Sequence, residues 1–190
     1  GSDTVTIAGT NFGSAAATVG VTVGGLACTV NSHTHVQILC TPTASFGKDK
    51  VVLVTVNSQS SSASGPKLNF FPPSIHAVTG CVNAGNQTTE CAITGGTTLS
   101  IHGEYFGASS SVTVGGIACT SVTLASTFRL ECTTPAGLNR DQPVVVTTDG
   151  QTGQGYMSYA TPMITDLSLV LSPTPTYTGP GGNLSMPSID

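Results

Sequence analysis

Six cysteines are the residues of this 190-residue sequence whose type and spacing most plainly allow chemistry. They are Cys28, Cys40, Cys81, Cys91, Cys119 and Cys132. Cysteines in such numbers form disulfides or bind zinc. No Cys-x-x-Cys pair occurs, and the four histidines do not stand at ligand spacing from the cysteines. Disulfides are therefore the favoured interpretation, and they predict an oxidising, extracellular setting.

Two Asn-x-Ser/Thr sequons predict N-glycosylation at Asn86 and Asn183. A Ser/Thr/Pro-rich stretch at 172–178 has the composition of segments that carry O-glycans, and an unmodified polyproline-like loop is the alternative. The candidate O-glycan acceptors are Ser172, Thr174, Thr176 and Thr178. Covalent glycans are the only non-protein groups that we expect.

No constellation in the sequence predicts an active site. His33 and His35 lie on the same side of an extended chain, but no carboxylate or third histidine stands in that segment to complete a metal site. Glu90, Glu104 and Glu131 could pair for glycoside hydrolysis only through the fold, and their spacing gives no support for it. A nucleophile elbow and a phosphate-binding glycine loop are both missing. We expect no enzymatic activity, no metal and no cofactor.

The composition excludes several classes of protein. Only 7% of the residues are charged and the net charge is −4, so the chain has no basic surface for nucleic acid. No apolar run reaches 18 residues, so we expect no membrane span. No secretory leader is recognisable, which predicts a mature or internal segment.

Short runs of alternating polar and apolar residues dominate the sequence. Such runs, and two β-branched runs, occupy residues 4–7, 19–23, 51–56, 98–101, 111–114 and 144–148. Gly, Asn, Asp or Pro separates them, and no segment has a sustained 3.6-residue period. The pattern predicts an all-β sandwich with almost no helix.

The chain contains the same unit twice. The matching stretches are 5–13 with 99–107, 23–28 with 114–119, and 73–75 with 162–164. Their offsets of 94, 91 and 89 residues stay nearly constant across the unit, which indicates a duplication. Position in the repeat also favours one of the fifteen possible cysteine connectivities. The predicted pairs are Cys28–Cys40, Cys119–Cys132 and Cys81–Cys91.

These matching stretches resemble the IPT/TIG family, an immunoglobulin-like sandwich found in plexin-type receptor ectodomains and other surface proteins. The family pattern begins with a Pro-x-Ile strand, continues with a Gly-x-x-Phe-Gly strand and turn, and then has a Val-Gly-Gly hairpin that leads to a cysteine. Residues 99–107 and 114–119 carry the last two parts. The resemblance covers the whole chain and implies two tandem sandwiches. It does not give the function, because the fold also occurs in DNA-binding transcription factors and glycan-processing enzymes.

The repeat divides the chain into three parts. Residues 1–71 form a unit that lacks its opening strand, residues 72–161 form a complete unit, and residues 162–190 supply an opening strand and loop. A strand at 162–190 would then complete the first domain of a neighbouring copy. We expect one period of a longer array, linked covalently or by strand donation between chains. A fragment whose ends happen to fall at these places is the alternative.

Two functions from different classes fit this organisation. The first is a structural unit of an extracellular, glycosylated filament or stalk, whose partners are further copies of itself joined head to tail. The alternative is a binding module of a cell-surface receptor or adhesin that contacts glycans or surface proteins, which requires an exposed apolar or aromatic patch. The aromatic residues outside the core motifs are Phe46, Tyr105, Phe128, Tyr156, Tyr159 and Tyr177. Residues 70–73, Phe-Phe-Pro-Pro, are expected at the junction between the domains.

Overall fold

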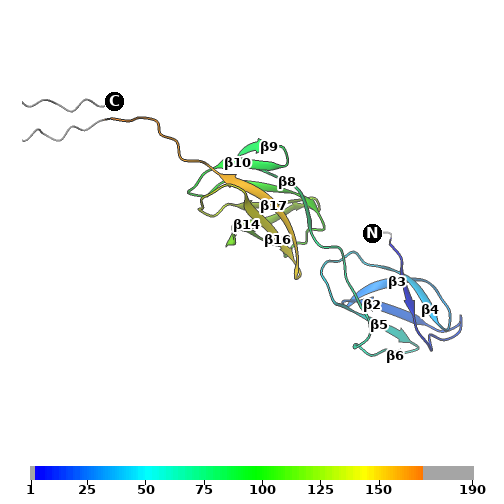
Figure 1. Cartoon of the computed structure of the whole chain (residues 1–190). Coiled ribbons are helices and arrows are strands. Elements are labelled where there is room, and N and C mark those ends of the chain that lie inside the picture. Colours follow the sequence, from blue (N-terminus) through cyan, green and yellow to red (C-terminus); the bar gives the residue numbers. More distant parts are fainter. Residues whose placement is uncertain (1–2, 169–190) are drawn as a thin grey trace, which may run out of the picture.

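A computed structural model describes residues 3–168, and every regular element in that range is a β-strand. The strands form two bodies joined end to end, the first blue to cyan and the second green to yellow (Figure 1). The predicted all-β fold is confirmed.

The first domain is one sheet that turns over on itself. Its strands are β1 (Val5–Ala8), β2 (Val19–Val23), β3 (Leu26–His33), β4 (Gln37–Pro42), β5 (Lys50–Val56), β6 (Gln59–Ser60) and β7 (Lys67–Leu68). They follow the order β1-β4-β3-β2-β5-β6, and β7 also pairs with β5. Because β3 pairs with β2 through its beginning and with β4 through its remainder, the sheet folds around a core between these halves. The buried core residues are Phe12, Val21, Val23, Cys28, Ile38, Cys40 and Val54.

The second domain is a sandwich of two sheets. Its strands are β8 (Ser74–Thr79), β9 (Val82–Ala84), β10 (Gln87–Cys91), β11 (Thr98–Glu104), β12 (Ser111–Val114), β13 (Ile117–Ala118), β14 (Thr120–Ser126), β15 (Arg129–Thr133), β16 (Gln142–Thr148) and β17 (Gln151–Tyr159). One sheet has the order β13-β12-β16-β17-β10-β9 and the other has the order β14-β15-β11-β8. The inward residues of both sheets, such as Ile101, Val144 and Met157, are fully buried.

Turn chemistry explains why both domains contain the same hairpin. Gly24 and Gly25 connect β2 to β3 with φ angles of 57° and 84°, and Gly115 and Gly116 connect β12 to β13 with the same two angles. Two consecutive left-handed residues define the type I′ turn that matches the twist of a hairpin. Glycine adopts both angles without steric cost.

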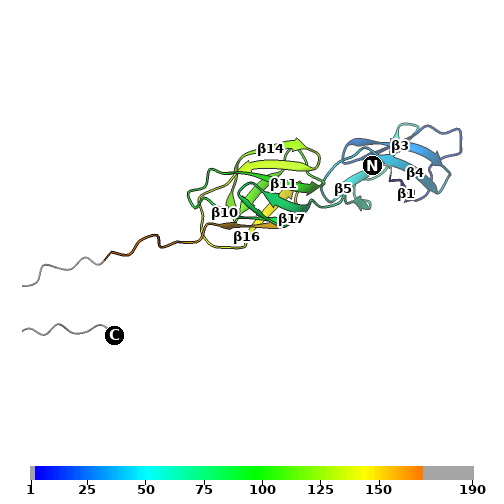
Figure 2. The same cartoon turned by 90° about the horizontal axis from the view of Figure 1, so that it is seen from above.

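The two domains lie along one axis. In both views the segment that follows β17 leaves the second domain at the end far from the first domain (Figures 1 and 2). In this segment the side chains of Met163, Ile164 and Leu167 are 80%, 87% and 92% exposed. A segment with exposed apolar side chains therefore lies at one end of an elongated molecule (Figure 1).

Candidate functional site

The outer edge of β1 is unpaired within the described residues. β1 pairs with β4 on one side only, with Val5 opposite Cys40 and Ile7 opposite Ile38. The backbone N–H and C=O groups of its other edge are therefore free to bind another strand, because an edge strand is a template for further pairing.

The second domain shows what covers this edge in a complete unit. β11 corresponds to β1, since Leu99 lies opposite Cys132 as Val5 lies opposite Cys40. Its outer edge is paired with β8, which is the opening strand of the unit. Val78 of β8 lies opposite Ile101 and is fully buried. Within residues 3–168, the first domain has the counterpart of β11 and no strand in the position of β8.

A groove lies beside β1, where the second domain has its opening strand. A cavity of about 620 Å³ lies between β1 and the segment 61–68, with Val52 and Val54 of β5 in its wall. Phe12, a core residue of the first domain, also lines it. The core of the first domain is therefore open along β1.

Small residues keep the corresponding space free in the second domain. A Cβ atom on Gly103 of β11 would lie 1.9 Å from the carbonyl oxygen of Ser74, and one on Gly153 of β17 would lie 2.2 Å from that of Pro73. The opening strand therefore passes too close for any side chain at either glycine. In the first domain, Gly9 corresponds to Gly103, and the nearest atoms to its Cβ position belong to the Phe12 ring. Among the placed residues, no strand backbone lies against Gly9 as β8 lies against Gly103.

A second cavity, of about 480 Å³, lies where the first domain meets the linker. Its wall includes Val5, Leu68 and Phe70. The counterparts of Leu68 and Phe70 are Met157 and Tyr159, which pair with β10 in the second domain. This cavity thus lies where a complete unit has its β10 strand. Aromatic side chains gather around it, because Phe46, Phe71 and Tyr105 contribute to the same wall.

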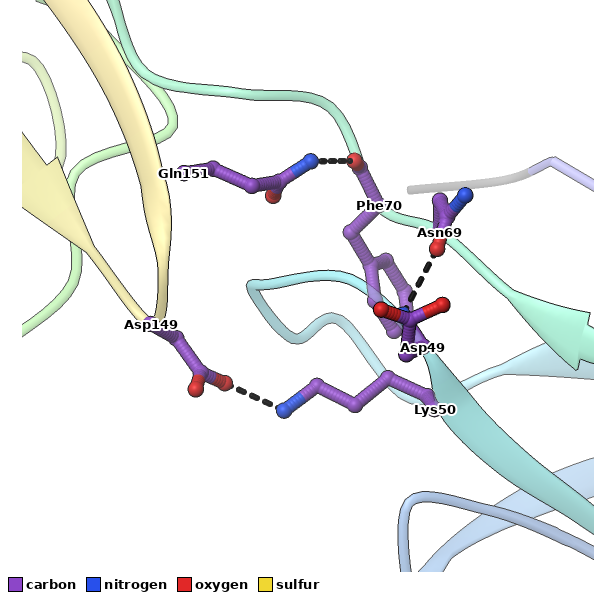
Figure 3. Close-up of polar contacts among 6 residues, drawn as sticks. All are labelled: Asp49, Lys50, Asn69, Phe70, Asp149 and Gln151. Carbon is purple, nitrogen blue, oxygen red and sulfur yellow. Dashed lines mark hydrogen bonds and ion pairs between the residues drawn. The ribbon is translucent and has the colours of Figure 1, made fainter.

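The junction between the domains is fixed by polar contacts from the turn between β16 and β17 (Figure 3). The Gln151 Nε2 atom donates a hydrogen bond to the Phe70 carbonyl oxygen at 3.0 Å. The Asp149 carboxylate forms an ion pair with Lys50, and both side chains are partly exposed. An exposed ion pair adds about 0–1 kcal/mol, so the partly buried hydrogen bond from the Gln151 side chain to the Phe70 backbone is the firmer of the two contacts.

An aromatic contact supports the same junction. The rings of Phe71 and Tyr105 are stacked with their centroids 5.2 Å apart. Tyr105 is 42% exposed and Phe71 is 63% exposed. Residues 70–73 lie between β7 and β8, and Phe70 and Phe71 both contact the second domain across this junction.

The structure contains two of the three predicted disulfides. Cys28–Cys40 links β3 to β4, and Cys81–Cys91 closes the loop that contains β9. The third prediction differs from the structure, in which Cys119 and Cys132 are buried free thiols. The two thiols share a hydrogen bond, and this bond and burial raise the pKa of Cys132.

The pairing register of β14 and β15 explains why the Cys119 and Cys132 thiols lie close together without a disulfide bond. Thr120 pairs with Thr133, one residue after each of these cysteines, just as Thr29 pairs with Thr41 in the first domain. The backbone therefore places both cysteine pairs alike, and the Cα atoms of Cys28 and Cys40 are 5.5 Å apart. Backbone register brings two thiols together, whereas formation of the bond also needs an oxidant.

The structure describes one of the predicted glycan sites, Asn86. Asn86 is exposed in the tight turn between β9 and β10, beside Gly85 with φ 65°. Thr88 of the same sequon is buried, and its hydroxyl accepts a hydrogen bond from the Cys81 amide. The remaining candidates, Asn183, Ser172, Thr174, Thr176 and Thr178, lie outside the described residues.

The residues weighed for metal binding do not gather into a metal site in the described part of the chain. Among residues 3–168, no three His, Cys, Asp or Glu side chains are grouped so as to hold a metal ion. The His33 ring binds the carbonyl oxygen of Ser14 and is accounted for by that contact. Of the aromatic candidates, Tyr159 is buried and donates to the Pro135 carbonyl, while Tyr177 lies outside the described part of the chain.

The IPT/TIG domain profile matches residues 1–70 and 86–162, which correspond to the two domains. The chain belongs to the IPT/TIG domain family. The sequence resemblance is thereby confirmed, and the sandwiches are immunoglobulin-like. The part of this IPT/TIG protein that the structure describes has no helix that could span a membrane.

Comparison with solved structures finds a similar fold in a surface glycan-binding protein. The surface glycan-binding protein PbSGBP-B of Prevotella bryantii aligns with 80% of the chain at 17% identity and a TM-score of 0.54, over 35% of its own length. The plexin A4 extracellular region aligns with 82% of the chain at 20% identity and a TM-score of 0.41, over 16% of its length. The chain therefore spans about a third or less of these proteins. No curated protein matches the sequence.

Proposed function

We propose that this IPT/TIG protein is a structural unit of an extracellular, glycosylated filament or stalk. Units join head to tail when residues 162–168 of one copy fill the groove along β1 of the next. The observation that carries the proposal is the open groove of about 620 Å³ beside the unpaired edge of β1. A partner that supplies one strand would complete both the sheet and the core.

The segment 162–168 has the sequence that the groove needs. Pro162, Ile164 and Leu167 stand where the opening strand of the second domain has Pro73, Ile75 and Val78. Since Val78 is fully buried and Leu167 is 92% exposed, docking would remove a large apolar side chain from water.

The placement of the two surfaces favours an open polymer. The β1 groove belongs to the first domain, and the segment 162–168 leaves the far end of the second domain (Figure 1). A contact between different surfaces at opposite ends repeats without closing on itself. The junction between the domains is held by a hydrogen bond, an ion pair and an aromatic stack, which suits a stiff rod.

Glycans and disulfides complete the proposal. The low charge leaves few repulsive groups to keep strand edges apart, and a glycan on exposed Asn86 would shield the turn between β9 and β10. We also propose glycans on Asn183 and on the 172–178 stretch. Closure of Cys119–Cys132 in an oxidising compartment would complete three disulfides.

A binding module is the second candidate function. The aromatic cavity at the junction, with Phe46, Phe71 and Tyr105 in its wall, is the observation in its favour. A sugar ring or a partner's apolar side chain would fit such a wall. The surface glycan-binding protein of similar fold makes glycans the first ligands to test.

Sedimentation velocity over a concentration series tests the structural proposal. We expect the chain to grow from monomers to a ladder of longer species, and we expect a peptide of residues 161–168 to reverse that growth. A scrambled peptide of the same composition is the control. A chain that stays monomeric at millimolar concentration, with no effect of the peptide, would overturn the proposal.

A further inference from the structure

The second domain ends in the same way as the first. In the first domain the Phe70 amide donates to the Gly47 carbonyl oxygen at 2.9 Å, just before the linker. In the second domain the Tyr159 amide donates to the Asn139 carbonyl oxygen at 3.1 Å. Both domains therefore fix the chain at the point where it leaves the sandwich, three residues before the Pro-x-Ile motif that follows at Pro73 or Pro162.

A second pair of contacts extends the likeness. The Asp49 amide donates to the Asn69 side-chain oxygen at 2.6 Å, and the Asp141 amide donates to the Ser158 hydroxyl at 2.9 Å. Asp49 and Asp141 have positive φ angles of 57° and 51°. The last strand residues of the second domain are thus held by the same contacts as those that precede the linker after the first domain.

The two domains also have corresponding turns at the end that faces the preceding unit. Gln151, which holds the Phe70 carbonyl, follows a two-residue turn at 149–150 and pairs with Thr148. Gln59 follows a two-residue turn at 57–58 and pairs with Val56. The φ angles are 45° and 77° in the first turn and 45° and 72° in the second. Gln59 is exposed, so its amide is free for a new partner.

We propose that Gln59 donates a hydrogen bond to the Tyr159 carbonyl oxygen of a second copy and so fixes the register of the joint between copies. This inference rests on the proposed function and adds the residue and the register that the joint uses. Phe70 and Tyr159 are equivalent by their amide contacts, and Gln151 and Gln59 are equivalent by their turns. The joint between copies therefore repeats the joint between the domains.

The register follows from β8. There Val78 lies opposite Ile101 and Thr79 lies opposite Ser100. Transferred to the groove, Leu167 lies opposite Ile7 and Ser168 lies opposite Thr6. A shift by one residue would turn Leu167 outward, and a shift by two residues keeps the apolar face inward, as when Asp166 lies opposite Thr6.

The joint between copies lacks the ion pair of the internal junction. Asn57 stands where the second domain has Asp149, and Gln142 stands where the first domain has Lys50. The new joint therefore contains amides in place of charges. We expect its strength to change little with salt.

Cross-linking between two variants tests the register. Thr6→Cys in one chain and Ser168→Cys in another should form a disulfide on mixing, which peptide mapping by mass spectrometry identifies. Thr6→Cys mixed with Asp166→Cys reports the two-residue shift, and each variant alone gives the background. Preferential cross-linking of Asp166→Cys would overturn the register while leaving the head-to-tail joint intact.

Gln59→Ala tests the hydrogen bond. We expect the dissociation constant between copies to rise about three- to tenfold, because one hydrogen bond is lost. Gln59→Glu, which keeps the shape without the N–H donor, should weaken the joint at least as much. Gln154→Ala, on the exposed face of β17, is the control. Unchanged association in both Gln59 variants would refute the role of Gln59, whereas association missing in the wild-type chain would refute the proposed function itself.

Discussion

Replacement of Leu167 by alanine should weaken the joint between copies without affecting the fold of either domain. The side chain is 92% exposed in the separate chain, so its removal costs little there. In the groove it would take the place that Val78 has in the second domain, where the exposed fraction is 0%. The variant therefore separates assembly from stability.

The size of the effect follows from that burial. Full burial of a leucine side chain contributes about 1.5–3 kcal/mol, and truncation to alanine in a packed site costs about 2–3 kcal/mol or more. A loss of about 2–3 kcal/mol raises the dissociation constant about 30- to 150-fold. Sedimentation equilibrium of wild-type and variant chains measures this ratio directly.

Thr165→Ala is the matched control, since its counterpart His76 remains exposed on the opening strand. We expect less than a threefold change in the dissociation constant for this variant. Thermal unfolding of both variants should match the wild type below the association threshold. An equal effect of the two substitutions on association, or no effect of Leu167→Ala, would refute burial of this side chain in the groove.

Three further predictions concern the domains themselves. Gly103→Ala should destabilise the second domain by about 3 kcal/mol, because the new methyl group would displace the opening strand. Gly9→Ala should destabilise the first domain by less in the monomer, because its methyl group would press on the Phe12 ring and on no strand backbone, and yet it should block association. Urea unfolding and sedimentation measure the two effects. Protein secreted through an oxidising compartment should contain no free thiol at Cys119 or Cys132, as measured by mass after alkylation. Asn86→Gln should remove the mass of one glycan from the secreted chain, as measured by intact mass spectrometry.

Each of these predictions has a control or a contradicting result. Gly20 has no atom within 4 Å of its Cβ position, so Gly20→Ala should leave both folding and association unchanged. Alkylation of two thiols in the secreted protein would show that the second-domain cysteines stay reduced. An intact mass that is identical before and after Asn86→Gln, apart from the substitution, would exclude a glycan there.

The strands and the duplication could be predicted from sequence because their signals are local. Alternation, glycine pairs and cysteine positions gave β2, β11 and β12 close to their observed bounds, and the repeat identified the opening strand at Pro73. The parallel pairing of β10 with β17 was not predicted, since it joins residues far apart in the chain and has no local pattern.

The site was only partly visible in the sequence. The repeat indicated that an opening strand was missing, but the groove beside β1, the second cavity near Phe70 and the contact from Gln151 depend on packing between distant segments. The state of Cys119 and Cys132 depends on an oxidant as well as on register. Gln59 could have been found by aligning the two turns, but nothing in the sequence marks a glutamine as a docking residue.

The most direct measurement of the central claim is a cryo-EM map of the assembled native protein at a resolution that traces the backbone. We predict density for residues 162–168 paired with the outer edge of β1 of the adjacent unit, with Leu167 in the groove and Tyr159 beside Gln59. Discrete particles in which this segment lies against its own chain or in solvent, with the β1 groove empty, would contradict the claim.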